Sequence, residues 1–304
     1  MTAAQGGYLF VHFTGTEEHA SDEQIYFALS PDGLHWHDLH QQQPILTSDV
    51  GEKGVRDPFI IRRRDGRFTI LATDLSIYHR GGWSHTKATT DGSSDLILWD
   101  SDDLIHWTAA RNIQVVPAGT GCAWAPETVW DPQRESYFVF WSSPVTPGGR
   151  TVILGSYTDD FIHFSTADTF IDRGPDKGII DTSVVRTGDR FVRASRDDGR
   201  ITLEKAENLH DHWQYLTSLQ DLDLGIHGDT VEGPEFAHLE DAWCVYVDQF
   251  AAGKGYLPLL TKDLTSTDPA DWSVAPDYDF GQLKKRHGAV MAVTAEEYAR
   301  LEKL

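Results

Sequence analysis

The chain consists mostly of short runs in which hydrophobic and polar residues alternate, separated by residues that favour turns. One clear stretch holds three such runs, at residues 56–63, 67–75 and 95–101, with an Asp-Gly turn between the first two. Alternation with a period of two, broken by turn residues, is typical of antiparallel β-strands joined in a meander. Helix signals are scarce, and the clearest lies at the C-terminus. The pattern therefore predicts an all-β fold that ends in a short helix or tail.

A recurring segment divides these strands into groups. Five times an acidic or polar turn leads into an aromatic residue, and these closing aromatics are Trp36, Trp107, Phe164, Trp213 and Trp272. They are 71, 57, 49 and 59 positions apart. A unit of about 50–70 residues with up to four strands, repeated five times, predicts a five-bladed β-propeller. We expect the five aromatics to pack between blades near the outer strands.

The strand runs also predict the blade boundaries. The first blade lacks an innermost strand, whereas the apolar segment 287–293 belongs to no other blade. A C-terminal strand that completes the first blade would close the ring and remove its open edge. We expect one domain over residues 1–304, with blades at about residues 8–40 plus 287–293, 56–110, 124–166, 179–217 and 231–274. The outer strands of the second and third blades are placed at residues 106–110 and 163–166.

Composition excludes several classes of partner. The chain has 26 Lys and Arg against 47 Asp and Glu, a net charge of −21. Such a surface repels nucleic acid and anionic membranes and suits neutral sugars better than polyanions. No apolar run approaches the roughly 18 residues of a membrane helix, and the N-terminus lacks the basic region of a secretory signal. Cys122 and Cys244 are interpreted as buried free thiols. We expect a cytoplasmic protein.

The starts of the innermost strands carry the candidate chemistry. They present Asp57, Trp124 with Glu127, Asp181, Glu232 and His287, which we interpret as matching positions of the repeat. In a propeller these positions converge on the central axis. Like charges in a shared cleft push pKa values apart. Cleavage of a glycosidic bond needs such a pair, with one carboxyl protonated and one ionised.

Each of these residues also has a purely structural interpretation. Asp57 precedes Pro58 and could begin a strand, and Asp181 could cap a turn. Glu232 could be a solvated loop acid, and His287 a core histidine. Their coincidence at the strand starts of a fivefold repeat favours function. It does not say which acid has which role.

The motifs RDPF (56–59), WAPE (124–127), IIDTS (179–183), EGP (232–234) and RHG (286–288) occur in this order along the chain. Together they resemble glycoside hydrolase family 43, whose five-bladed propellers hydrolyse arabinose- and xylose-containing glycans with inversion. The resemblance implies that Asp57 is the general base and Glu232 the general acid. Asp181 would tune the pKa of the acid and orient it.

The resemblance also implies roles around these acids. His287 would lie near the axis, beside a structural calcium ion, although one histidine is a poor calcium ligand. No cofactor is required for the reaction. The loop between residues 74 and 95 is the longest and is expected to wall a pocket or to cover the neighbouring blade. The candidate substrate-contacting residues are Phe59, Asp74, Trp83, Trp124, Glu127, Trp141 and Arg196.

The substrate is less well determined, since one scaffold supports several activities. A propeller without a further module suits short oligosaccharides, which favours an exo-acting pocket. The opening YLFVHFTG and the segment GEKGVRDPF look most like arabinofuranosidase-type members. We expect an exo-acting α-L-arabinofuranosidase, with β-xylosidase or a galactan- or galactofuranoside-cleaving enzyme as alternatives.

Retaining fructoside-cleaving propellers need an early WMNDPNG-type motif, which is absent before Arg56. A non-catalytic sugar-binding propeller is the alternative from another class.

Overall fold

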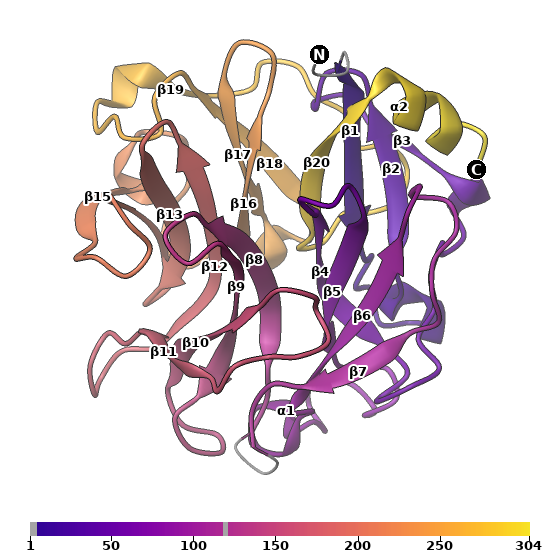
Figure 1. Ribbon diagram of the computed structural model, residues 1–304. Helices are drawn as coiled ribbons and strands as arrows, with labels where there is room; N and C mark the ends of the chain where they lie inside the picture. The colour runs from indigo at the N-terminus through magenta and orange to yellow at the C-terminus, as the bar shows by residue number, and fades with distance from the viewer. Residues whose placement is uncertain (1–4, 118–120) are drawn as a thin grey trace.

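Five four-stranded antiparallel sheets make up the described part of the molecule. The computed structural model describes residues 5–117 and 121–304, so residues 1–4 and 118–120 of the expected domain lie outside the described residues. The sheets are arranged as the blades of a propeller (Figure 1), which confirms the all-β, five-bladed fold predicted from the repeat. Each blade is a meander from an innermost to an outermost strand.

The strand bounds are as follows. The first blade contains β20 (Ala289–Thr294), β1 (Gln5–His12), β2 (Tyr26–Ser30) and β3 (His37–Asp38). The second contains β4 (Val55–Arg62), β5 (Phe68–Asp74), β6 (Asp95–Ser101) and β7 (Arg111–Gln114). The third contains β8 (Trp124–Asp131), β9 (Ser136–Pro144), β10 (Thr151–Thr158) and β11 (Asp168–Ile171). The fourth contains β12 (Ile179–Thr187), β13 (Arg190–Asp197), β14 (Arg200–Ala206) and β15 (Gln214–Ser218). The fifth contains β16 (Glu232–His238), β17 (Trp243–Asp248), β18 (Tyr256–Thr261) and β19 (Trp272–Val274).

The C-terminal strand closes the ring as expected. β20 pairs antiparallel with β1, so the last strand of the chain becomes the innermost strand of the first blade. The helix that follows, α2 (Ala295–Leu301), begins with a capping box in which Thr294 and Glu297 bond each other's backbone N–H groups. Glu297 also receives a two-pronged hydrogen bond from Arg62 of β4. The closing segment is thereby joined to the second blade as well as the first.

The repeated turn has a common hydrogen-bond pattern in the first three blades. Asp32, Asp103 and Asp160 each accept hydrogen bonds from the backbone N–H groups two and three residues ahead, and each carboxylate also bonds the Nδ1 of a following histidine. A hydroxyl before the aspartate also takes part: Oγ of Ser101 accepts a hydrogen bond from the backbone N–H of Leu104, three residues later. These bonds satisfy the backbone inside the turn.

The turn explains why two outer strands begin later than predicted. In the second blade, the turn built on Asp103 holds the chain through Trp107, whose indole donates to the carbonyl of Leu104. Residues 106–110 are therefore not the outer strand, and β7 begins at Arg111. In the third blade β11 likewise begins at Asp168, beyond the predicted segment 163–166. Next to the turn, Trp107 makes only an isolated antiparallel bridge with Ser101, and continuous pairing with β6 starts at Arg111.

The core is divided among the five interfaces between neighbouring blades. One buried apolar cluster lies at each interface, and each cluster contains one of the five repeat aromatics: Trp107 between blades one and two, Phe164 between two and three, Trp213 between three and four, Trp272 between four and five, and Trp36 between five and one. This confirms that the repeat aromatics pack between blades. Cys122 and Cys244 are free and buried, as expected. No helix in residues 5–117 and 121–304 is long and apolar enough to cross a bilayer.

Candidate active site

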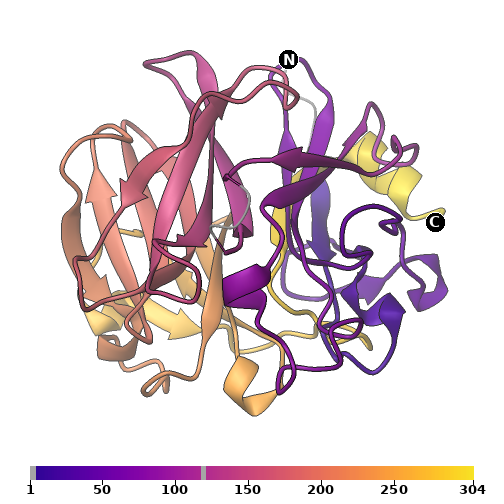
Figure 2. The same cartoon turned by 90° about the horizontal axis from the view of Figure 1, so that it is seen from below.

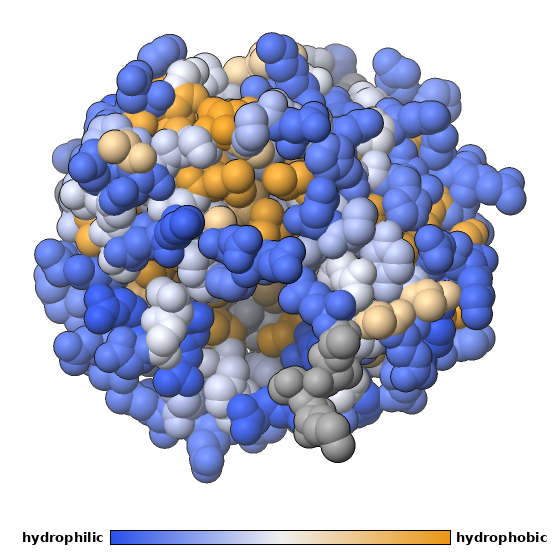
Figure 3. Space-filling view, turned by 90° about the horizontal axis from the view of Figure 1, so that it is seen from above, coloured by the Kyte–Doolittle hydropathy of each residue, from blue (hydrophilic) through white to orange (hydrophobic). Residues whose placement is uncertain are grey.

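A cavity of about 310 Å³ lies where the innermost strands of the propeller begin. Asp57, Trp124, Asp181, Glu232 and His287 all line it. Figure 2 views the molecule from this end, which carries the loop with α1 (Ala88–Asp91, purple) and the turn that contains residues 250–252 (light orange). The structure therefore brings the predicted catalytic residues together. The opposite end (Figure 3) has a mainly hydrophilic rim, with apolar side chains grouped among polar ones.

Each of four innermost strands begins with a β-bulge. The ladder registers shift at the bulges, and at each bulge one residue has a positive φ: Asp57 (48°), Ala125 (49°), Asp181 (49°) and Gly233 (52°). A bulge places two residues of one strand opposite one of its partner and redirects nearby side chains. Glycine, and less readily aspartate, tolerates this left-handed conformation. The strained backbone lies where the cavity is formed.

The bulges correct the alignment expected from sequence. Asp57 and Asp181 do occupy equivalent left-handed positions. Glu232 instead stands one residue earlier, at the position held by Arg56, Trp124 and Ile180 in the other blades. Glu127 stands two residues after the left-handed Ala125, where the fifth blade has Glu235. The interpretation of all these acids as matching positions was therefore wrong in detail.

Asp57, Asp181 and His287 form the floor of the cavity. The Nδ1 of His287 lies 3.7 Å from Oδ1 of Asp57 and 3.9 Å from Oδ1 of Asp181. Thr73 donates a hydrogen bond of 2.9 Å to Oδ2 of Asp57, which orients that carboxylate. The backbone N–H of Gly233 donates to Oδ2 of Asp181 at 3.2 Å. Asp181 thus stands between the candidate base and the strand that carries the candidate acid.

His287 also explains the glycine in the EGP motif. A Cβ atom added to Gly233 would lie 2.6 Å from the imidazole ring, and the φ of +52° disfavours any side chain there. Only glycine lets the fifth blade approach the histidine so closely.

Glu232 has the environment of a general acid. Burial, together with the negative charges of Asp181 and Asp248, raises its pKa to about 8. Arg286 opposes this rise, since its Nη2 lies 3.0 Å from Oε1 of Glu232. The same arginine donates through Nε to the fully buried Asp248 at 2.5 Å, so its charge is shared. The raised pKa favours the protonated form of Glu232 at neutral pH.

Asp181 is more deeply buried than Glu232. Burial raises its pKa, while the neighbouring His287 acts in the opposite direction and the charge of Asp57 adds to the rise. An acid in this position interacts with both candidate catalytic carboxyls. The arrangement fits the role of orienting Glu232 and tuning its pKa.

A second pair of acids lies behind the cavity. Glu127 and Glu235 are buried, and burial raises the pKa of both, that of Glu235 to about 8. Ser183 donates to Oε2 of Glu235, and the backbone N–H of Val290 donates to Oε1. Glu127 is 4% exposed and is absent from the lining of the cavity, so it belongs to the packing around the axis.

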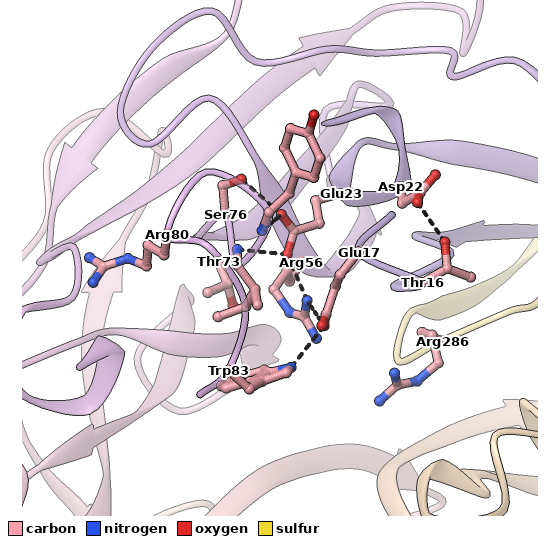
Figure 4. Close-up of polar contacts among 12 residues, drawn as sticks. Thr16, Glu17, Asp22, Glu23, Arg56, Thr73, Ser76, Arg80, Trp83 and Arg286 are labelled. Carbon is pink, nitrogen blue, oxygen red and sulfur yellow. Dashed lines mark hydrogen bonds and ion pairs between the residues drawn. The ribbon is translucent and has the colours of Figure 1, made fainter. Parts of the chain in front are cut away.

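The long loop between β5 and β6 is anchored by a buried carboxylate, shown in Figure 4. Glu23 is fully buried and accepts hydrogen bonds from Oγ of Ser76, from the N–H groups of Ile77 and Tyr78, and from Arg56. The same contacts hold the guanidinium of Arg56 next to the start of β4. The loop is thus attached to the first blade at the point where it leaves β5.

Trp83 forms the outer wall of the cavity. Its indole N–H donates to Oε1 of Glu17 at 2.9 Å, and Arg56 donates to the same oxygen at 2.8 Å (Figure 4). The guanidinium of Arg56 lies 5.3 Å from the centre of the indole. Trp83 remains 51% exposed. An exposed indole held in place beside a cavity offers a flat surface to a sugar ring.

Other predicted substrate contacts are placed elsewhere. Trp141 is fully buried between the second and third blades, and Phe59 packs against that apolar cluster and against the one between the first and second blades. Asp74 is buried under the turn at Gly51, where it accepts the N–H of Glu52, and burial raises its pKa to about 6. These three residues do not line the cavity. Arg196 lies beside it, in an adjoining groove.

Several lining residues were missed from sequence. Arg56 and Arg286 directly precede Asp57 and His287, and Phe250 comes from the turn between β17 and β18. Arg56 and Arg286 could have been found from the sequence, because each stands immediately before a residue that was predicted to lie on the axis. Phe250 had no such signal, since only the folding of its turn brings it to the cavity.

The described residues provide no set of protein ligands for a metal ion. No group of three or more His, Cys, Asp and Glu side chains in residues 5–117 and 121–304 is arranged to hold one. Ca²⁺ takes six to eight oxygen ligands, whereas His287 offers nitrogen and lies between two carboxylates. The calcium ion implied by the resemblance stays a prediction.

Comparison with known proteins gives the family. Residues 4–299 match a family described as a probable glycosyl hydrolase domain, related to glycoside hydrolase family 43. An α-L-arabinofuranosidase of Bifidobacterium longum subsp. longum is 29% identical over an alignment of 177 residues, which covers 51% of this chain but only 16% of that protein. The chain therefore spans a small part of the length of this curated relative.

Solved structures share the fold at low identity. An α-L-arabinofuranosidase from Lactobacillus brevis aligns with a TM-score of 0.57 and 15% identity, over 81% of this chain and 80% of that one. An N-acetylgalactosamine deacetylase from F. plautii aligns with a TM-score of 0.56 and 13% identity, over 97% and 87%. The two names describe different reactions, so the fold does not select one. By its match over residues 4–299, the chain belongs to the glycosyl hydrolase family related to glycoside hydrolase family 43.

Proposed function

We propose that the protein is an inverting, exo-acting glycoside hydrolase that releases a terminal pentose, and specifically an α-L-arabinofuranosidase. The observation that carries the proposal is the placement of Glu232, whose pKa is raised to about 8, in one small cavity with Asp57 and Asp181. A carboxyl that keeps its proton at neutral pH can donate it to a leaving oxygen. The cavity of about 310 Å³ suits one sugar ring better than a chain.

The proposed mechanism uses the three acids in different roles. Asp57 removes a proton from a water molecule, and the water oxygen attacks the anomeric carbon. Glu232 gives its proton to the glycosidic oxygen as the bond between that oxygen and the anomeric carbon breaks. The negative charge of Asp181 helps to keep Glu232 protonated, and one displacement on the face opposite the leaving group inverts the configuration.

Three observations support the proposed substrate. The Bifidobacterium relative and the L. brevis structure both carry the name α-L-arabinofuranosidase. Trp83, Trp124 and Phe250 line the cavity and give it apolar surfaces against which a sugar ring can pack. The net charge of −21 suits a neutral substrate.

A panel of aryl glycosides tests the substrate. We expect turnover of aryl α-L-arabinofuranoside, with kcat/KM at least about tenfold above that of aryl β-D-xyloside or aryl β-D-galactoside, because a misfitting ring loses about 1–3 kcal/mol of transition-state binding. Activity on the xyloside alone would reject arabinofuranosidase in favour of the runner-up. If the protein binds a sugar but turns over no pentoside, galactoside or fructoside, a sugar-binding propeller is the correct interpretation.

The stereochemistry of the first product tests inversion. We expect proton NMR to detect the β-anomer of arabinose first when an α-L-arabinofuranoside is hydrolysed, since one displacement inverts the anomeric carbon. Mutarotation then yields the equilibrium mixture. First appearance of the α-anomer would mean two displacements and would remove Asp57 from the role of base.

A further inference from the structure

A second hollow adjoins the cavity across the end of the fourth blade. It is an open groove of about 360 Å³ that shares Ile180 with the cavity. Thr151, Gly178, Arg196, Gly199 and Asp229 also line it. The groove runs outward over the ends of β10, β12 and β13, on the same face of the propeller as the catalytic acids.

An arginine-aspartate pair stands where the groove meets the cavity. Arg196 donates to both carboxylate oxygens of Asp229, with Nη2 at 2.7 and 2.9 Å. Its guanidinium also lies 5.2 Å from the ring centre of Phe250, which lines the cavity. Arg196 is close enough to Asp181 and Glu232 for its charge to act on both.

Asp229 retains the capacity to bind a ligand. Its side chain is 52% exposed, whereas that of Arg196 is 20% exposed. The side chain of Asp229 packs against Gly199 so closely that a Cβ atom there would lie 3.1 Å from the carboxyl carbon of Asp229. The pair thus presents a fixed acceptor beside a partly covered donor, a combination that can bond the adjacent hydroxyl groups of a sugar.

The position of the general acid indicates which part of the substrate would occupy the groove. A general acid must face the leaving oxygen, so the leaving part of the substrate has to depart on the side of Glu232. The guanidinium of Arg196 packs on Phe250, which belongs to the same blade as Glu232, whereas Asp57 of the second blade lies beside His287. A sugar joined through the protonated oxygen would therefore enter the groove.

We propose that this groove binds the leaving part of the substrate, a neutral oligosaccharide whose adjacent hydroxyl groups bond the Arg196–Asp229 pair. The inference rests on the proposed function, since that function defines the leaving group. It goes further in assigning a second binding site, with its own determinants of specificity. An aryl leaving group without hydroxyls would make no such bonds.

Asp229→Asn tests the groove through substrate discrimination. We expect the ratio of kcat/KM on an arabinose-substituted xylo-oligosaccharide to that on aryl arabinofuranoside to fall about tenfold or more, as expected for loss of one charge-assisted hydrogen bond. The matched control is Asp65→Asn, which alters another exposed arginine-paired aspartate, 43% exposed, in the hairpin between β4 and β5. The control should leave the ratio unchanged. An equal fall on both substrates in D229N would overturn the proposal, because it would mean that the pair acts only on the catalytic acids.

A binding measurement separates this inference from the proposed function. Xylotetraose, α-1,5-arabinotetraose and β-1,3-galactotriose are titrated into the wild type and D229N, with saturation-transfer NMR as the readout. We expect at least one of the three to bind the wild type and to bind D229N about tenfold more weakly. That result would support the groove even if no glycoside were hydrolysed. Absence of binding by all three, or equal binding to both proteins, would refute the groove without bearing on catalysis in the cavity.

Discussion

Replacing Glu232 with glutamine is expected to lower kcat/KM by about 10²–10⁴-fold on substrates whose leaving group needs protonation. Glutamine keeps the size of the side chain but has no acidic proton to donate. An aryl leaving group of low pKa departs without help, so its hydrolysis should fall much less. A series of aryl arabinofuranosides with increasing leaving-group pKa provides the measurement, and the loss should grow along the series. A uniform loss along it would remove Glu232 from the role of acid.

The pH profile gives an independent readout of the same residue. Because the pKa of Glu232 is raised to about 8, the acid loses its proton as pH rises through about 8, and wild-type activity should fall there. The E232Q variant should lack this alkaline limb on an activated aryl substrate. Glu240→Gln is the matched control, since Glu240 is an exposed glutamate in the same blade, beyond the far end of β16. An alkaline limb that persists in E232Q would assign it to another group.

Replacing Asp57 with alanine is expected to lower kcat/KM by about 10³-fold or more, equally on activated and poor leaving groups. The attacking water then has no base, and this requirement does not depend on the leaving group. Equal loss along the aryl series thus distinguishes the base from the acid. The fold should tolerate the change, because the equivalent left-handed position of the third blade already holds Ala125 with φ 49°.

Added azide sharpens the test of Asp57. Azide is an anion that attacks without losing a proton, so it should restore part of the activity of D57A and yield a glycosyl azide of inverted configuration. Asp102→Ala, which alters an exposed aspartate of the same blade, should behave as wild type. Hydrolysis by D57A within tenfold of wild type would exclude Asp57 as the base. Formation of a glycosyl azide of retained configuration would indicate two displacements instead.

Much of the fold could be predicted because a propeller blade is built from local interactions. The turn around Asp103 is satisfied within a few residues, and its pattern recurs in the segments that hold Asp32 and Asp160. Closure by β20 followed from an unpaired edge in the first blade and a spare strand at the end of the chain. The outer strands of the second and third blades were misplaced, because the backbone bonds of the turns were not visible in the alternation.

The candidate site was predicted in part. The strand starts of a propeller meet at its axis, so Asp57, Asp181, Glu232 and His287 were expected to converge, and all four line one cavity. Phe59 and Trp141 were assigned to the substrate but lie between blades. A strand changes the face of a side chain with every residue, and one bulge changes the register. Which face a side chain occupies after a bulge depends on how the neighbouring strands pair, and this pairing cannot be read from one strand alone.

By itself the sequence determined the all-β class, the fivefold repeat, the closing strand and the set of acids at the strand starts. All of these follow from periodicity and from turn chemistry that acts over a few residues. Only the tertiary structure decided the offset between Asp57 and Glu232, the burial that raises the pKa of Glu232, and the groove beside it. Arg196 and Asp229 are 33 positions apart and meet because two blade segments pack together. Desolvation and long-range pairing exist only once the blades have assembled, so no local pattern could have specified them.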